Sequence, residues 1–191
     1  SIVESNCASA SQAYSISSGV TDYRWVMKNV PAIKKEGFTS TVNNYLAKIE
    51  FQLSGYQQPL TPKNIMGTWP MLTKSLMENE YFGLPLKTPN SWLSDVVKPL
   101  VAASTSDADK ARRIYAYVRD NFTCTDYSNI YIDKSLKDVM KTKKGNVSEL
   151  NLLLIAMMKY AGLYAEPVIL STSDNGFVYS LYPILRRFNY V

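Results

Sequence analysis

Histidine is absent from the chain of 191 residues. Imidazole is the usual proton acceptor beside a nucleophilic cysteine or serine, and it is the commonest zinc ligand besides cysteine. Catalysis by Cys-His or Ser-His pairs and zinc sites built on histidine are therefore excluded, unless a segment outside this chain supplies the imidazole. We expect neither a metal site nor a cofactor.

Long apolar runs are lacking too. No stretch approaches the roughly 20 apolar residues of a membrane-spanning helix. The first residues, SIVESNCASASQ, have neither the basic start nor the apolar core of a signal peptide. We expect a soluble chain without a membrane span, whose export signal has been removed or never existed.

Cysteine is scarce, with only Cys7 and Cys124 in the chain. Their spacing leaves two alternatives open, a single bridge or two free thiols. A bridge would suit an oxidising compartment, whereas two buried thiols would suit either side of a membrane.

The charges are scattered along the sequence. There are 21 Lys and Arg against 16 Asp and Glu, a formal net charge of +5, and the densest basic run lies within residues 141–144. A nucleic-acid footprint needs a contiguous basic face, so we expect no nucleic-acid partner. With 46% hydrophobic and 19% charged residues, the composition is that of a globular protein.

Strand patterns mark the first third of the chain. Apolar and polar residues alternate over residues 45–53, and a period of two predicts a strand with one face on a core. Residues 23–27 form a second candidate strand, which ends before Pro31 because proline interrupts a ladder. We therefore predict a small β unit within residues 1–58.

Helical patterns begin near residue 60. Thr68 is placed to cap a helix that runs through Trp69 and Leu76, and a second helix is predicted over residues 92–100 with a kink or break at Pro99. The third pattern is the clearest, because Ser106 and Asp109 form a start similar to a capping box. The predicted inner face of this third helix carries Ala111, Ile114, Tyr115 and Val118.

The last third mixes both patterns. A short helix is predicted over residues 136–140, and an apolar helix over residues 146–160 that Ala161-Gly162 would end. Residues 127–132 are expected to be irregular or short β, and Asp174-Asn175-Gly176 to form a turn. Strands are predicted over residues 165–170, 177–184 and 188–191.

A glycine turn that feeds directly into an apolar helix, followed by Ala-Gly-Leu and a strand, resembles the core of transglutaminase-like domains, a branch of the papain-like α+β fold. In bacterial members the motif reads Gly-Asp-Cys before the helix. Here Gly145 matches the glycine, Asn146 replaces the aspartate and Val147 stands where the cysteine belongs. Glu149 falls on a position that is usually acidic.

The resemblance extends to both sides of this turn. Residues 98–118 look like the helix pair that precedes the catalytic turn, and Phe188-Asn189-Tyr190-Val191 resembles the Phe-Asn-His-Val strand, with Tyr190 in the place of the histidine. Residues 25–32 are similar to the last part of a β-rich domain of unknown function that often precedes such domains in large bacterial envelope proteins.

This resemblance implies a fold of the α+β class, with a transglutaminase-like (papain-like) core of helices packed on an antiparallel sheet and a short β unit before it. Residues 1–58 would be the end of a preceding β domain. Residues 59–191 would be the transglutaminase-like domain, truncated at its C-terminal end. The implied location is the bacterial envelope, in the periplasm or outside the cell.

The same resemblance argues against catalysis. In active members the cysteine attacks an amide or ester carbonyl and the histidine accepts its proton. Val147 has no nucleophilic atom, and a tyrosine such as Tyr190, with a pKa near 10, is a poor base at neutral pH. Ser148 cannot substitute, because one residue along a helix turns the side chain by about 100°. Cys124 has no base nearby in the sequence.

The leading hypothesis is therefore a catalytically inactive domain that serves as a binding or scaffolding module for a protein, peptide or glycan. The candidate groove residues are Asn146, Ser148, Glu149 and Asn189. Val147 itself is expected to pack in a helical stripe with Leu150, Leu154 and Met158. Tyr190 either packs at the core or rim, or lines a surviving groove with a free hydroxyl.

Two alternatives stay open. The first is a cysteine-type amide hydrolase or acyl transferase whose missing catalytic groups lie outside this chain. The second is a structural domain whose exposed sheet edge is completed by a partner strand or by a second copy in a homo-oligomer.

Overall fold

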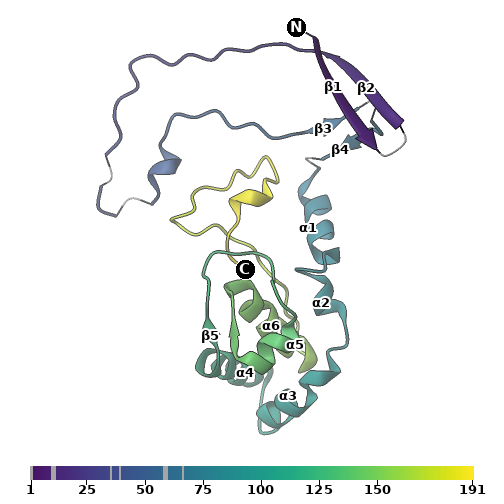
Figure 1. Cartoon of the computed structure of the whole chain (residues 1–191). Helices are drawn as coiled ribbons and strands as arrows, with labels where there is room; N and C mark the ends of the chain where they lie inside the picture. The colour runs from purple at the N-terminus through teal and green to yellow at the C-terminus, as the bar shows by residue number, and fades with distance from the viewer. Residues whose placement is uncertain (1, 10–11, 35, 39, 58–59, 66) are drawn as a thin grey trace.

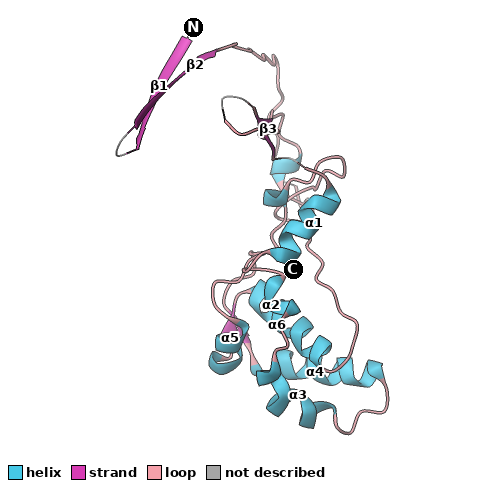
Figure 2. Cartoon of the chain, turned by 90° about the vertical axis from the view of Figure 1, so that its right-hand side faces the viewer, coloured by secondary structure: helices cyan, strands magenta, loops and turns pink. Residues whose placement is uncertain are grey.

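The computed structural model describes residues 2–9, 12–34, 36–38, 40–57, 60–65 and 67–191, with the backbone alone for residues 2–9 and 12–18. Four helices gather at one end of the molecule, namely α3 (Ser94–Val101), α4 (Asp107–Asn121), α5 (Leu136–Thr142) and α6 (Val147–Tyr160) (Figures 1 and 2). The hairpin of β1 (Ile2–Ser9) and β2 (Gln12–Gly19) lies at the other end (Figures 1 and 2). The two strands pair antiparallel, with Ile2 opposite Gly19 and Ser9 opposite Gln12.

The strands predicted over residues 23–27 and 45–53 are not formed, so these predictions were wrong. The described residues between Gly19 and β3 (Gly55–Tyr56) contain only one short 3-10 helix, Val42–Asn44. β3 pairs antiparallel with β4 (Lys63–Asn64) over two residues of each strand. Side chains such as Trp25 and Phe51 are 55% and 68% exposed. The alternation was present in the sequence, but a strand also needs a neighbour to pair with.

The helices α1 (Trp69–Glu78) and α3 follow the sequence predictions, whereas α2 (Leu84–Lys87) was not predicted. α1 is capped by Thr68, whose Oγ1 accepts from the N–H of Met71 at 3.5 Å. α2 follows, and then a 3-10 turn over Ser91–Leu93 leads into α3. Pro99 lies inside α3, so the break falls at the 3-10 turn and not at the proline.

α4 (Asp107–Asn121) starts as predicted, with Ser106 Oγ accepting from the N–H of Asp109 at 3.1 Å. Ile114 and Val118 are buried on its inner face. Tyr115 is 52% exposed, contrary to the prediction. Tyr117 takes the inner position, where its ring packs edge-to-face on Phe122 at 5.9 Å between centroids.

The centre of the domain is α6 (Val147–Tyr160), which contacts α2, α3, α4 and α5 (Leu136–Thr142). β5 (Thr123–Cys124) pairs in parallel with β6 (Lys144–Gly145) just before α6 begins. The helix ends at Tyr160, and Gly162 follows with a φ of +81°, as the predicted glycine stop requires.

The predicted antiparallel sheet is wrong for the part of the chain that follows Thr68. There the pairing consists of β5 with β6, which is parallel, and of one antiparallel bridge between Leu170 and Tyr190. Exposure alternates over residues 161–170, as in a strand with one packed face, but these residues have no ladder beyond that bridge. The turn at residues 173–175 is formed, followed by Gly176 with a φ of +113°. The chain nonetheless combines helices with a small amount of strand, in agreement with the α+β class.

Polar contacts cross the predicted domain boundary at residue 58. The side-chain Oδ1 of Asn44 accepts from the N–H of Phe177 at 2.9 Å, and Glu50 forms an ion pair with Arg187. The segment of residues 41–51 therefore lies beside the C-terminal segment of the domain (Figure 1).

Candidate functional site

The N-terminus of α6 is a closed hydrogen-bonded unit. Asn146 Oδ1 accepts from the N–H of Glu149 at 2.9 Å, and Glu149 Oε2 accepts from the N–H of Asn146 at 2.9 Å. This is a complete capping box, and the two residues are 3% and 2% exposed. The sequence allowed it, since Asn and Glu stand three residues apart before an apolar run.

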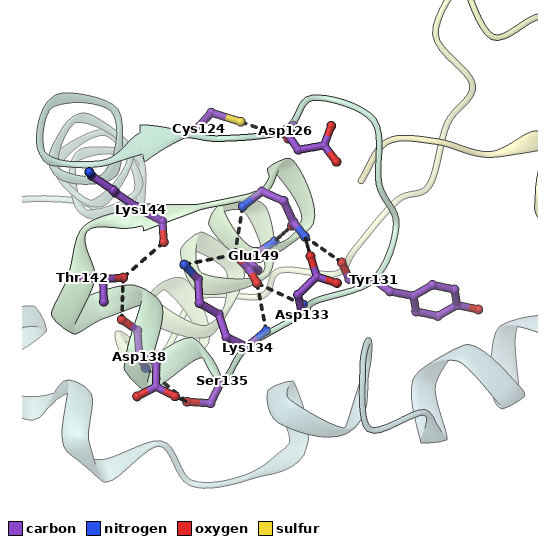
Figure 3. A network of polar contacts seen from close by, with 11 residues as sticks. Cys124, Asp126, Tyr131, Asp133, Lys134, Ser135, Asp138, Thr142, Lys144 and Glu149 are labelled. Carbon is purple, nitrogen blue, oxygen red and sulfur yellow. Dashed lines mark hydrogen bonds and ion pairs between the residues drawn. The ribbon is translucent and has the colours of Figure 1, made fainter.

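The buried Glu149 carboxylate also binds the preceding loop. Its Oε1 accepts from the N–H groups of Asp133 and Lys134, each at 3.0 Å, and Lys134 Nζ lies 4.0 Å from Oε2. Figure 3 shows Glu149 between α6 and this loop, with the dashed bonds converging on its oxygens. Charge-assisted bonds of this kind compensate the cost of burying a carboxylate.

Asn146 and Ser148 bind the same loop. Asn146 Nδ2 donates to the carbonyl of Tyr131 at 3.1 Å and to Asp133 Oδ2 at 3.0 Å. Ser148 Oγ donates to the carbonyl of Asn129 at 2.5 Å, and the residue has no exposed surface. The loop of residues 129–134 is thus fixed on the first turn of α6.

Gly145 permits this close packing. A Cβ atom at this position would lie 2.8 Å from Glu149 Oε2 and 3.2 Å from Val139 Cγ1. Gly145 is therefore required here for the approach of a carboxylate, and its φ is not positive.

Val147, which occupies the position of the expected cysteine, is 3% exposed, and its N–H donates to the carbonyl of Asp126 at 2.8 Å. The predicted stripe with Leu150, Leu154 and Met158 is only half-buried. The fully packed face of α6 instead comprises Glu149, Leu152, Leu153, Ala156 and Met157. Val147 is thus buried as predicted, but the stripe was misplaced, because helices contact α6 on several sides.

Three of the four predicted groove residues are buried. Asn146, Ser148 and Glu149 are at most 3% exposed and bind the loop at residues 129–134. The hydrogen bonds that fold this loop over the helix were not visible in the sequence pattern. Because of these hydrogen bonds, the polar side chains that we predicted to contact a ligand are buried under the loop.

Asn189 is half-buried and connects three segments. Its Oδ1 accepts from the N–H of Thr172 at 2.9 Å, and its Nδ2 donates to the hydroxyls of Thr172 and Ser128 at 2.9 and 3.2 Å. Its amide therefore already has protein partners on both ends.

Tyr190, in the position of the expected histidine, is half-buried. Its backbone pairs with Leu170, and the carbonyl of Val191 accepts from Asn151 Nδ2 at 2.6 Å. Asn151 lies one turn after Val147 on α6, and this bond joins α6 to the residue that follows Tyr190.

Cys124 is a free, half-buried cysteine, and its Sγ lies 3.3 Å from the carbonyl of Asp126. Burial raises the pKa of its thiol, and this effect outweighs the hydrogen bond to the carbonyl of Asp126, which lowers the pKa. A raised pKa lowers the thiolate fraction and hence the nucleophilicity at neutral pH. The side chain of Cys7 lies outside the described residues.

Within the described ranges there is no group of three or more His, Cys, Asp or Glu side chains that could hold a metal ion. Within those same ranges no helix has the length and apolar character required to cross a membrane.

Sequence reasoning missed a cavity of about 360 Å³ between residues 80–92 and residues 132–137. Trp92 was attributed to a helix face, and residues 132–137 were considered only as loop and short helix. The one signal in the sequence was the clustering of Tyr81 and Trp92 with charged residues in neighbouring segments.

Residues 94–181 match the model of the Transglutaminase-like superfamily. No curated protein and no solved structure shows a significant match to the chain. The matched range begins at α3 and includes the capping box of α6, and it ends before Tyr190.

Proposed function

Residues 94–181 form a transglutaminase-like domain, and we propose that this domain is catalytically inactive and serves as a binding module. The observation that carries the proposal is Val147, a buried valine at the position where the resemblance places the nucleophilic cysteine. A valine side chain can neither attack a carbonyl nor be activated by a base.

The helix end supports the same conclusion. Free N–H groups at a helix N-terminus lower the pKa of a cysteine and stabilise developing negative charge. In this chain the N–H of Val147 binds the carbonyl of Asp126, and the N–H of Glu149 binds the side chain of Asn146. These two donors are used to hold the fold and do not point at a reacting group.

The remaining candidates for catalysis are weak. Ser148 is fully buried and donates to a backbone carbonyl, and the pKa of Cys124 is raised. The chain supplies no imidazole for either of them. Loss of one member of a nucleophile-base unit typically lowers the rate by several orders of magnitude, and loss of both adds little.

The polar residues at the start of α6 have a different use in this proposal. Asn146 and Glu149 hold the loop of residues 129–134 on α6. In this proposal the turn before α6 therefore fixes the position of that loop and carries out no catalysis. We propose a peptide ligand over a protein or glycan, for reasons given below. The envelope location is proposed from the family resemblance, and fractionation of the source cells followed by immunodetection tests it.

The proposal is tested by assaying the purified chain for amide hydrolysis and acyl transfer on a panel of peptide substrates. We expect no product above the buffer control. Ser148→Ala and Cys124→Ala are assayed in parallel. Reproducible turnover that either substitution abolishes would show that the chain is an enzyme and would overturn the proposal.

A further inference from the structure

We propose that the cavity between residues 80–92 and 132–137 binds short zwitterionic peptides with apolar side chains. This inference rests on the proposed binding function and specifies its site and ligand class. The cavity volume of about 360 Å³ lies within the range of about 300–1,000 Å³ that is typical of small-molecule sites. Neither Val147 nor Tyr190 lines it.

The lining of the cavity includes apolar and aromatic side chains beside polar ones. Ile132 and Leu136 are 6% and 4% exposed and contribute from one wall. Pro85, Tyr81 and Trp92 contribute from the other. An apolar surface of this size suits an aliphatic or aromatic side chain, which would displace water from it.

Trp92 is held in place before any ligand binds. Its indole N–H donates to Asn90 Oδ1 at 3.1 Å, and Asn90 Nδ2 donates to the carbonyl of Pro85 at 2.9 Å. Asn90 has a φ of +43°, in the left-handed region, which asparagine adopts more readily than other non-glycine residues.

The two walls are also fixed relative to each other. The N–H of Ile132 donates to the carbonyl of Tyr81 at 3.0 Å, which joins the walls directly. The buried Glu149 accepts from the N–H groups of Asp133 and Lys134, so the capping box of α6 fixes the wall formed by residues 132–137 (Figure 3). A preformed cavity loses less entropy on binding.

The charges at the rim select the ligand class. Asp133 and Lys134 have partners in Asn146 and Glu149. Glu80 and Lys137 are exposed, come from different walls, and form no ion pair within the described part of the chain. One unpaired carboxylate and one unpaired ammonium complement a free amine and a free carboxylate. A neutral sugar would leave both charges without a partner.

The test uses leucyl-leucine as the probe, titrated into the full chain and followed by two-dimensional NMR. We expect saturable shifts at Trp92 and at residues 132–137. N-acetylation or C-terminal amidation of the probe should each weaken binding about two- to fivefold, as expected for one exposed ion pair.

Charge variants identify the partners. Glu80→Gln should weaken leucyl-leucine binding about two- to fivefold, because the ion pair with the free amine of the probe is lost. The same substitution should leave binding of the N-acetylated probe unchanged, because that probe has no charged amine that could pair with Glu80. Lys137→Gln should likewise weaken leucyl-leucine binding about two- to fivefold and leave binding of the C-terminally amidated probe unchanged, because that probe has no carboxylate. Glu78→Gln and Lys141→Gln are matched controls, since both residues are exposed and neither lines the cavity.

Absence of saturable shifts, or equal affinity for the free and the blocked probes, would overturn this inference. So would shifts that neither rim variant affects. Mass spectrometry of the recovered dipeptide distinguishes failure of the proposed inactivity from failure of the proposed binding site. Hydrolysis of the probe would contradict inactivity but would not contradict peptide binding in the cavity.

Discussion

Apolar residues are about equally frequent in the segment of residues 20–57 and in the helical region from α1 to α6. The two regions differ in how far these side chains are buried. Every buried hydrophobic residue in the described part of the chain lies between Leu76 and Val191. In the N-terminal segment, large side chains such as Tyr23, Val26 and Leu53 are at least 60% exposed. An apolar pattern thus predicts burial only where another element supplies the opposing surface.

The two regions also differ in where their hydrogen bonds go. A helix satisfies its backbone within itself, so local signals such as Thr68 and Ser106 suffice to start one. A strand needs a partner segment, and residues 45–53 have none in the structure. The comparison can be tested by substitutions in both regions.

The largest effect is expected from Glu149→Ala. The substitution removes the acceptors of the N–H groups of Asp133, Lys134 and Asn146 and leaves the buried N–H of Asn146 unpaired. We expect a loss of about 3–5 kcal/mol in the free energy of unfolding, measured by urea denaturation. Glu166→Ala, which removes an exposed ion pair with Lys159, should cost less than about 1 kcal/mol. Equal costs would show that the buried network does not stabilise the domain.

Core substitutions compare the two regions directly. Leu153→Ala, at a position with no exposed surface, should lower the free energy of unfolding by about 2–5 kcal/mol. Phe51→Ala, at a position 68% exposed, should change it by about 0.5 kcal/mol or less. Thermal and urea unfolding measure both. A large loss for Phe51→Ala would mean that the N-terminal segment is packed in solution.

Gly145→Ala tests the close approach at the start of α6. The added methyl group would meet Glu149 Oε2 at 2.8 Å, so the carboxylate would have to move. Overpacking of this kind costs about 1–3 kcal/mol, measured by urea denaturation. Gly37→Ala is a suitable control, because a Cβ there has no atom within 4 Å. If both variants are equally stable, the turn is less tightly packed than described.

Helix caps give a smaller effect. Ser106→Ala removes the acceptor for the N–H of Asp109 at the start of α4 and should cost about 1 kcal/mol. Thr41 caps the 3-10 turn Val42–Asn44 in the N-terminal segment, with Oγ1 3.3 Å from the N–H of Asn43. Thr41→Ala should leave the unfolding of the helical region unchanged. Circular dichroism at 222 nm follows the helices in both variants.

The smallest effect concerns Cys124, whose thiol pKa is raised mainly by burial. In a Cys7→Ser variant, alkylation by iodoacetamide should be slower for the folded than for the unfolded chain near neutral pH. Because the unfolded thiol ionises first, stability should fall slightly as the pH rises above the unfolded pKa. Faster alkylation of the folded chain would indicate an activated thiol and would reopen the question of catalysis.

Much of the helical fold could be predicted from the sequence, because the signals are local. The caps at Thr68 and Ser106 and the stop at Gly162 are where the pattern placed them. The exposure of Tyr115 and the unpaired segment at residues 165–169 were missed, since both depend on which neighbours are present.

The candidate site divides in the same way. The sequence alone determined that this chain has no histidine and that a valine stands at the position of the expected cysteine, because chemical identity does not depend on folding. Only the tertiary structure decided that Asn146, Ser148 and Glu149 face inward and that a cavity forms between residues 80–92 and 132–137. Burial and cavities arise from contacts between residues far apart in the chain, and no local pattern encodes those contacts.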